Sequence, residues 1–363
     1  MHLQLRGHVL LSMLIISSAA TVSAQQQRER STCTLLPVPH AGKFGYVDGS
    51  GKLLISARFD NAECFHEGLA LVQVGSRYGF IDKFGELVIP SAFEDASSFS
   101  EGLAAVSVGR KWGYIDSRGQ MVISPRFDDR GFPPAAQPFS EGLAAVKFDR
   151  ITSYIDKTGH MVIAPGYGLF SDFSEGLAAV RPVGGQDWGF IDRTGKVAIP
   201  FQFHNAHAFH EGLAAVIVRG SGDKQFDNQG FIDRTGRLVV PAKFWWAQDF
   251  SDGLAAVTTL DKKVGYIDRD EGFVIAPQFA QGGKFSEGLA PVMPHAGGQI
   301  GFVDKTGKII ITPQFTEVCP FVDGLSLVEV ATKIGVIDRS GRFVWGPMVE
   351  QNTWGEGGLP CPR

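Results

Sequence analysis

The chain has few cysteines and no large excess of acidic or basic residues. Each of these features argues against a class of protein. Lys and Arg number 34 against 38 Asp and Glu, with no long run of either sign. A nucleic-acid-binding protein would need a basic stripe, so no nucleic-acid partner is expected. The four cysteines contain no Cys-x-x-Cys pair, which argues against a zinc site. Beyond residue 24, no apolar run is long enough to span a membrane.

The first 24 residues have the pattern of a secretory signal peptide. A basic start at Arg6 precedes an apolar stretch over Val9–Ile16, and the small residues Val22 and Ala24 stand before Gln25. That order predicts cleavage after Ala24, with a membrane anchor as the alternative. We therefore expect an exported protein, periplasmic or extracellular, with no membrane span after cleavage.

The rest of the chain is dominated by one repeated motif. Its clearest copy is FSEGLAAVSVGRKWGYIDSRGQMVISP, over Phe99–Pro125. The aspartate of the GYID step recurs at Asp48, Asp82, Asp116, Asp156, Asp192, Asp233, Asp268, Asp304 and Asp338. Periodicity of this kind indicates a tandem repeat architecture. We predict a linker over 25–32, an array of nine units over 33–347 and a tail or cap over 348–363.

Each unit is predicted to be a three-stranded antiparallel sheet. Three runs rich in aliphatic, β-branched and aromatic residues (GLAAV, GYID and the run before Pro125) are short and bounded by Gly, Pro and Asp, which favours strands. Asp116 to Gly119 has the composition of a hairpin turn, so the repeated aspartates need no metal to explain them. The connector after each sheet carries two phenylalanines six residues apart, such as Phe93 and Phe99, and is predicted to be a helical turn or tight loop packed on the sheet.

The repeat resembles the WG-repeat proteins of bacteria, named for the Trp-Gly pair that opens the GYID strand. That pair is literal at Trp112-Gly113 and Trp188-Gly189, and GYIDxxGxxVIxPxF and FSEGLA recur in register. The resemblance implies an all-β repeat array, often exported, with no established activity. It brings no catalytic residues and no cofactor.

The ends of the array bear on whether it closes. The first unit has its own first strand at Leu35–Val38 and the last has its own final strand near Arg342–Pro347, so neither needs a strand from the other. This favours an open superhelical solenoid, with a closed propeller-like ring as the alternative. Cys33, Cys64, Cys319 and Cys361 all lie in the first or last units. Of three possible connectivities, we predict Cys33–Cys64 and Cys319–Cys361, which would stabilise the two ends.

Departures from the repeat point to a binding surface. Trp245 and Trp246 stand where other units are polar, and His204 is predicted one unit away, beside Trp245. Adjacent exposed tryptophans would form an interaction patch for sugar rings or protein side chains; the alternative is that one tryptophan fills a gap beside the insertion Arg219–Gln229. His204, His207 and His210 have a spacing that could hold a metal, but no carboxylate is expected to complete a ligand set with them, so they are interpreted as exposed polar substitutions and no metal site is predicted.

Two functions remain at this point. The first is a non-catalytic binding or scaffold module for a cell-envelope polysaccharide or an unknown protein. The second is a glycan hydrolase, which would need one special carboxylate pair. The candidate acids are Glu101, Glu141, Glu175, Glu211 and Glu287. Because they recur from unit to unit, they are better explained by turn formation, and the chain is predicted not to be an enzyme.

Overall fold

The computed structural model describes residues 33–128, 134–148, 151–219 and 228–349, together with Leu359 and Cys361. Across these residues all regular structure is β-strand and no helix occurs. The predicted signal peptide and linker, and most of the predicted tail, lie outside the described residues. Accordingly, the described part of the chain contains no helix that could cross a membrane.

The strands form eight antiparallel sheets, one of which has six strands and contains two repeat units. Nine units, called blades 1 to 9 here, therefore follow one another along the chain. Their strands are β1(Leu36–His40), β2(Lys43–Val47) and β3(Leu53–Phe59) in blade 1; β4(Asn61–His66), β5(Leu69–Val74), β6(Arg77–Ile81) and β7(Leu87–Phe93) in blade 2; β8(Asp95–Ala96), β9(Leu103–Val108), β10(Lys111–Asp116) and β11(Met121–Asp128) in blade 3; β12(Leu143–Phe148), β13(Ile151–Asp156) and β14(Met161–Phe170) in blade 4; and β15(Leu177–Pro182), β16(Trp188–Asp192) and β17(Val197–Phe203) in blade 5.

The remaining blades follow the same plan. They are β18(Asn205–Ala206), β19(Leu213–Val218), β20(Asn228–Asp233) and β21(Leu238–Phe244) in blade 6; β22(Trp246–Ala247), β23(Ala255–Thr258), β24(Val264–Ile267) and β25(Phe273–Phe279) in blade 7; β26(Gln281–Gly282), β27(Leu289–Met293), β28(Ile300–Asp304) and β29(Ile309–Phe315) in blade 8; and β30(Glu317–Val318), β31(Leu325–Val330), β32(Lys333–Asp338) and β33(Phe343–Val349) in blade 9.

The prediction of three strands per unit is correct for blades 1 and 4. In blade 5 the end of β14 supplies a fourth strand, where Phe170 pairs with Val180, and the prediction is also incomplete for the other six blades. In those six, part of the connector forms a short fourth strand, as where Ala96 pairs with Val106 and Ala206 with Val216. Of the two expectations for the connector, the helical turn is wrong and the tight loop packed on the sheet is the better description. The connector backbone bonds to the neighbouring strand; Ser97 N–H, for example, donates to Ala105 C=O at 2.9 Å. The connector phenylalanines Phe99 and Phe209 are buried, as expected of core residues.

The Asp-x-x-Gly segments form hairpin turns, as predicted. At Asp116, one carboxylate oxygen accepts the backbone N–H groups of Arg118 and Gln120, and Gly119 N–H donates to the Asp116 carbonyl. Gly119 has φ +77°, a conformation that a residue with a Cβ adopts only with strain. The aspartates are thus committed to closing turns.

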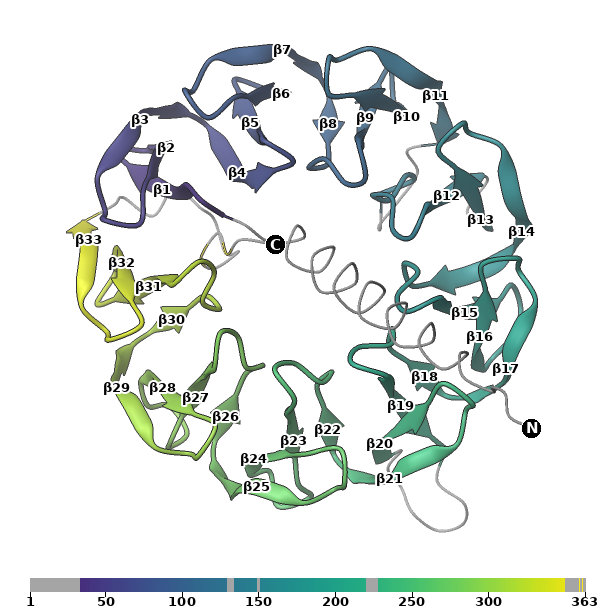
Figure 1. Ribbon diagram of the computed structural model, residues 1–363, viewed down its shortest axis with the longest axis vertical. Helices are drawn as coiled ribbons and strands as arrows, with labels where there is room; N and C mark the ends of the chain where they lie inside the picture. Colours follow the sequence, from purple (N-terminus) through teal and green to yellow (C-terminus); the bar gives the residue numbers. More distant parts are fainter. Residues whose placement is uncertain are drawn as a thin grey trace, which may run out of the picture.

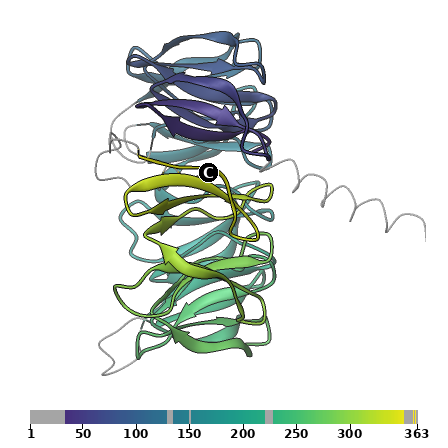
Figure 2. The same ribbon diagram turned by 90° about the vertical axis from the view of Figure 1, so that its left-hand side faces the viewer.

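The blades are arranged in a closed ring (Figure 1), and the expected open solenoid is wrong. Seen from the side, the ring is a flat disc whose strands run across its thickness (Figure 2). A core cluster joins Leu36, Val38 and Val47 of blade 1 to Leu327, Ile334, Val336 and Trp345 of blade 9. Closure occurs without a shared strand because every blade has two apolar faces, and the free faces of blades 1 and 9 cover each other.

One contact repeats from blade to blade around the ring and continues across the closure. A Cβ built on the turn glycine Gly119 of blade 3 would lie 3.2 Å from Ile89 of blade 2, and one built on Gly341 of blade 9 would lie 2.9 Å from Ile311 of blade 8. At the closure, a Cβ on Gly51 of blade 1 would meet Val344 of blade 9. The turn of blade 1 therefore lies against the outer strand of blade 9, although it meets the backbone there rather than an isoleucine side chain.

A second repeated contact involves the Ser-Glu-Gly turn between the short strand and the next strand. Glu101 and Gly102 both have positive φ, 54° and 87°, in a two-residue hairpin closed by Ser100 and Leu103. The acidic side chain of this turn accepts the glycine N–H of the same turn in the next blade, an interaction that we call the inter-blade clip. The clips are Glu67–Gly102, Glu101–Gly142, Glu141–Gly176, Glu175–Gly212, Glu211–Gly253, Asp252–Gly288 and Glu287–Gly324.

The two disulfides pair as predicted, Cys33 with Cys64 and Cys319 with Cys361. All four cysteines pack in or against the cluster that closes the ring. The segment before β1 contains no Glu-Gly pair, so blade 1 cannot take part in a clip. The disulfides therefore lie at the two junctions that the clips do not cover.

Candidate functional site

The predicted tryptophan patch lies where blade 6 meets blade 7. Trp245 occupies the turn between β21 and β22, and Trp246 begins β22. Trp245 N–H donates to the Thr258 carbonyl at 2.9 Å, and Trp246 pairs with Thr258 in the sheet. The backbone of both tryptophans is thus fixed on the rigid edge of β23.

Both tryptophan side chains are exposed. Trp245 is 50% and Trp246 43% exposed, and Leu260, in the turn that follows β23, is 64% exposed. The alternative expectation, that one of the tryptophans fills an internal gap, does not fit these exposures. Whether the patch binds anything stays a prediction.

The histidine that contacts a tryptophan is His207, which was not among the predicted binding residues. Its ring meets that of Trp246 at 6.2 Å between centroids, in an edge-on arrangement. His204 is exposed in the turn after β17, the position in blade 6 that Trp245 occupies in blade 7. That His204 lies beside Trp245 stays a prediction, whereas the ring of His207, three residues further on, contacts Trp246 of the next blade.

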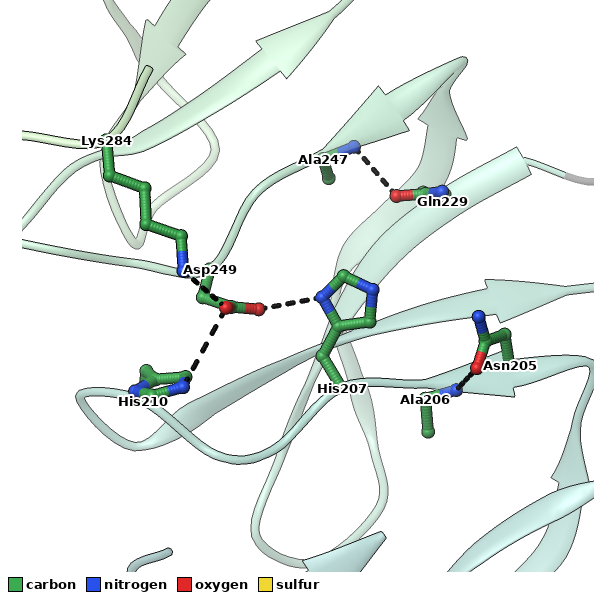
Figure 3. A network of polar contacts seen from close by, with 8 residues as sticks. All are labelled: Asn205, Ala206, His207, His210, Gln229, Ala247, Asp249 and Lys284. Carbon is green, nitrogen blue, oxygen red and sulfur yellow. Dashed lines mark hydrogen bonds and ion pairs between the residues drawn. The ribbon is translucent and has the colours of Figure 1, made fainter. Parts of the chain in front are cut away.

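A polar network extends from His207 across three blades (Figure 3). Asp249 of blade 7 lies at its centre. One carboxylate oxygen is 2.8 Å from His207 Nδ1, and the other is 2.6 Å from Lys284 Nζ of blade 8 and 3.7 Å from His210 Nε2. This arrangement holds the His207 ring against Trp246 and joins blades 6, 7 and 8 at their inner hairpins.

The network sets the ionisation of Asp249. Burial of this carboxyl would raise its pKa, but the hydrogen bonds from His207 and Lys284 and the charge of Lys284 outweigh burial and lower the pKa well below its usual range. Asp249 is therefore an anion at neutral pH. Its carboxylate holds the Lys284 ammonium and the ring of His207 rather than serving as an acid.

Asp172 contrasts with Asp249. It stands in blade 5 immediately before the connector residue Phe173, as Asp249 stands before Phe250 in blade 7. Desolvation by the surrounding atoms raises the pKa of the Asp172 carboxyl to about 6, although the residue as a whole is exposed. The same repeat position thus holds one carboxyl that ionises readily and one that does so only near neutrality.

The histidine spacing that could have indicated a metal has a different explanation. His207 and His210 both face Asp249, a residue about 40 positions away that sequence spacing could not associate with them. Lys284 shares this carboxylate, and an ammonium group there competes with any cation. Within the described ranges no group of three or more His, Cys, Asp or Glu side chains is arranged to hold a metal.

The five candidate acids of the hydrolase hypothesis all belong to inter-blade clips. Glu101, for example, accepts N–H groups from both Glu141 and Gly142 of the next blade. Their recurrence therefore has a structural cause, as predicted. That cause is contact between blades rather than closure of their own turn.

A ring of radially arranged antiparallel sheets, most of them four-stranded, is a β-propeller. Rigid scaffolds of this class often carry binding residues on their loops. The chain belongs to the WG containing repeat family, whose model matches residues 44–78, 78–112, 112–150, 153–185, 188–220, 230–263, 265–293 and 300–331. No curated protein matches the chain by sequence.

Solved structures show the same fold at low identity. The chain is similar to a crystal structure of the eukaryotic initiation factor, with a TM-score of 0.61, 12% identity, and coverage of 85% of this chain and 94% of that one. It is also similar to BamB from Moraxella catarrhalis, with a TM-score of 0.42, 12% identity, and coverage of 83% and 92%. At 12% identity, the likeness to the initiation factor concerns the fold alone.

Proposed function

We propose that this protein is an exported, non-catalytic binding module that uses the Trp245–Trp246 patch to hold a cell-envelope polysaccharide. The observation that carries the proposal is the exposure of two adjacent tryptophans on a rigid strand edge. Large exposed apolar surfaces usually mark interaction sites, and aromatic anchors tend to dominate binding energy. The flat faces of two indoles suit sugar rings, and a partner's apolar side chains are the alternative ligand.

The local chemistry supports a binding role rather than a catalytic one. Asp249 is tied to two histidines and a lysine, and the repeated acids hold the inter-blade clips. Export is supported by the two disulfides, because structural disulfides persist in oxidising compartments. The signal-peptide pattern in the first 24 residues supports the same location.

The test is binding of purified envelope polysaccharide to the mature chain and to Trp245→Ala/Trp246→Ala. We expect the double variant to lose at least about tenfold in affinity, because each lost aromatic anchor removes about 1 kcal/mol or more. Phe84→Ala is the matched control, since Phe84 is 74% exposed in the Asp-x-x-Gly turn of blade 2. Equal binding by the double variant, with its melting temperature unchanged, would reject the patch. Loss of binding to an envelope protein instead would favour the protein-partner alternative.

A further inference from the structure

Two junctions between blades hold an arginine in the same way. Arg58 lies over the ring of Phe59 in blade 1, 5.2 Å from the centroid, and donates to the carbonyl of the turn residue Gly85 in blade 2. Arg126 lies over Phe127 in blade 3 at the same distance and donates to the carbonyl of Gly159 in blade 4. Each guanidinium thus fills the wedge between an outer strand and the next blade's turn.

A third junction uses a lysine. Lys243 lies over Phe244, 5.6 Å from the centroid, and its ammonium is 2.8 Å from Glu271 in the turn of blade 7. The acceptor here is a carboxylate, whereas the two arginines meet neutral carbonyl groups. The wedge is therefore a repeated position for a cation stacked on an aromatic ring.

At the junction of blades 4 and 5, the cation is missing while its surroundings remain. Gly166 stands where Arg58 and Arg126 stand in their blades, and Tyr167 takes the place of the phenylalanine. Tyr167 pairs with Thr152 as Phe127 pairs with Trp112. In blades 2, 5, 6, 7 and 8, the position before the aromatic residue of the outer strand is occupied by Ala92, Gln202, Lys243, Gln278 and Gln314, respectively.

The turn glycine also keeps its place. A Cβ built on Gly195 would lie 3.1 Å from Ile163, and one built on Gly159 would lie 3.2 Å from Ile123. The turn of blade 5 therefore approaches blade 4 as closely as the turn of blade 4 approaches blade 3. A groove of about 580 Å³ lies here, lined by residues that include Val162, Gly166, Tyr167, Gly195 and Phe201.

Tyr167 is more exposed than the aromatic residue at this position in other blades. Phe59 and Phe127, beneath their arginines, are 3% and 0% exposed, and Phe93 and Phe315, which follow Ala92 and Gln314, are 8% and 0% exposed, whereas Tyr167 is half-buried. Val162, Val197, Pro182 and Phe201 supply apolar walls, which suit the aliphatic stem of a long side chain.

We propose that the groove between blades 4 and 5 binds an arginine side chain of a protein partner, in the position that Arg58 and Arg126 fill from within the chain. The guanidinium would stack on Tyr167 and donate to the Gly195 carbonyl, and its stem would lie against Val162 and Val197. Arginine suits this site better than lysine because a planar guanidinium stacks on an aromatic face and donates to a neutral carbonyl at once. This site is independent of the tryptophan patch.

The first experiment is an amide NMR titration of the mature chain with N-acetyl-L-arginine methylamide. We expect saturable shifts at Thr194 and Gly195, with an affinity in the millimolar range typical of a single small contact. The citrulline analogue, which has the same shape without the charge, should bind at least about tenfold more weakly. An arginine-containing peptide should produce the same shifts as the capped amino acid. Peptides that are excluded while free arginine derivatives bind would overturn the protein-partner assignment.

Two variants make the test specific. Gly166→Arg fills the groove from within and should abolish the shifts at Gly195, with its fold verified by an unchanged melting temperature. Arg126→Gly should create a second arginine-dependent response, at Gly159, which is silent in the parent chain. Equal response to citrulline, persistence of the shifts in Gly166→Arg, or no saturable shift would each overturn the proposal. Should Arg126→Gly fail to fold, the citrulline comparison and the Gly166→Arg variant still test the proposal. Trp245→Ala/Trp246→Ala should leave this titration unchanged. A failure of the arginine-site proposal can therefore be distinguished from a failure of the polysaccharide-site proposal.

Discussion

The carboxylate of Glu141 accepts the backbone N–H of Gly176 at 2.8 Å, although the two residues lie 35 positions apart and on different blades. Glu141 has φ 54°, a conformation unfavourable for a residue with a Cβ. Glycine would adopt it without strain, yet glutamate or aspartate occupies this position in eight blades. The inter-blade hydrogen bond explains why an acidic side chain stands there.

Removal of this clip should destabilise the ring although it relieves backbone strain. Glu141→Gly is expected to lower the free energy of unfolding by about 1–3 kcal/mol, the range for a hydrogen bond to a charged group, less the small gain from the glycine backbone. Denaturant unfolding measures this change, with the exposed Glu86→Gly as control. Stability equal to or above that of the parent chain would contradict the role of the clip.

The raised pKa of Asp172 makes stability depend on pH. The folded-state pKa is about 6 and the unfolded value is near 4, so the folded protein binds the proton more tightly. Stability should therefore fall as pH rises from about 4 to about 6 and stay lower above that.

Asp172→Asn removes this dependence. It should raise the free energy of unfolding relative to the parent by no more than about 1 kcal/mol above pH ~6, because Asp172 is exposed and solvent screens the effect, and by much less below pH ~4. Unfolding measured across this range checks the prediction. A difference between the two proteins that is independent of pH would place its cause in packing instead.

Asp249 should behave in the opposite way. Its pKa is lowered in the folded state, so its contribution is fully present above the unfolded value near 4 and is lost as pH falls further. Asp249→Asn should cost about 1–3 kcal/mol at neutral pH, because His207 and Lys284 lose a charged acceptor. The difference in free energy of unfolding between the parent and Asp249→Asn should become smaller only at acidic pH. The exposed control Asp270→Asn should change the free energy of unfolding little at any pH.

The disulfides should contribute to the free energy of unfolding by linking the parts of the ring that have no inter-blade clip. Cys33→Ser/Cys64→Ser opens a link across 31 residues and should cost about 3–4 kcal/mol by the chain-entropy relation. Non-reducing peptide mapping of the parent should recover only the pairs Cys33–Cys64 and Cys319–Cys361. Detection of crossed pairs, or thermal unfolding unaffected by the double substitution, would contradict this arrangement.

The repeat itself determined most of the local structure. Aliphatic and β-branched runs bounded by Asp-x-x-Gly specify strands and hairpins from neighbouring residues alone, so Ile115 and Ile191 lie in strands as the pattern indicates. The position of the four cysteines in the terminal units was enough to predict their pairing. The register also identified Trp245 and Trp246 as departures from a polar position, and both side chains are exposed.

Closure of the array was decided only by tertiary structure. Whether nine blades form a ring or a superhelix depends on the small rotation between neighbours, which arises from side-chain packing such as that of Val38 in the same cluster as Val336 and has no local sequence signature. The same holds for contacts between blades. Asp249 meets His207, and Glu141 meets Gly176, because the ring brings together equivalent or neighbouring positions of successive repeats. The sequence determined what each blade is, and packing between blades decided which of its side chains came together.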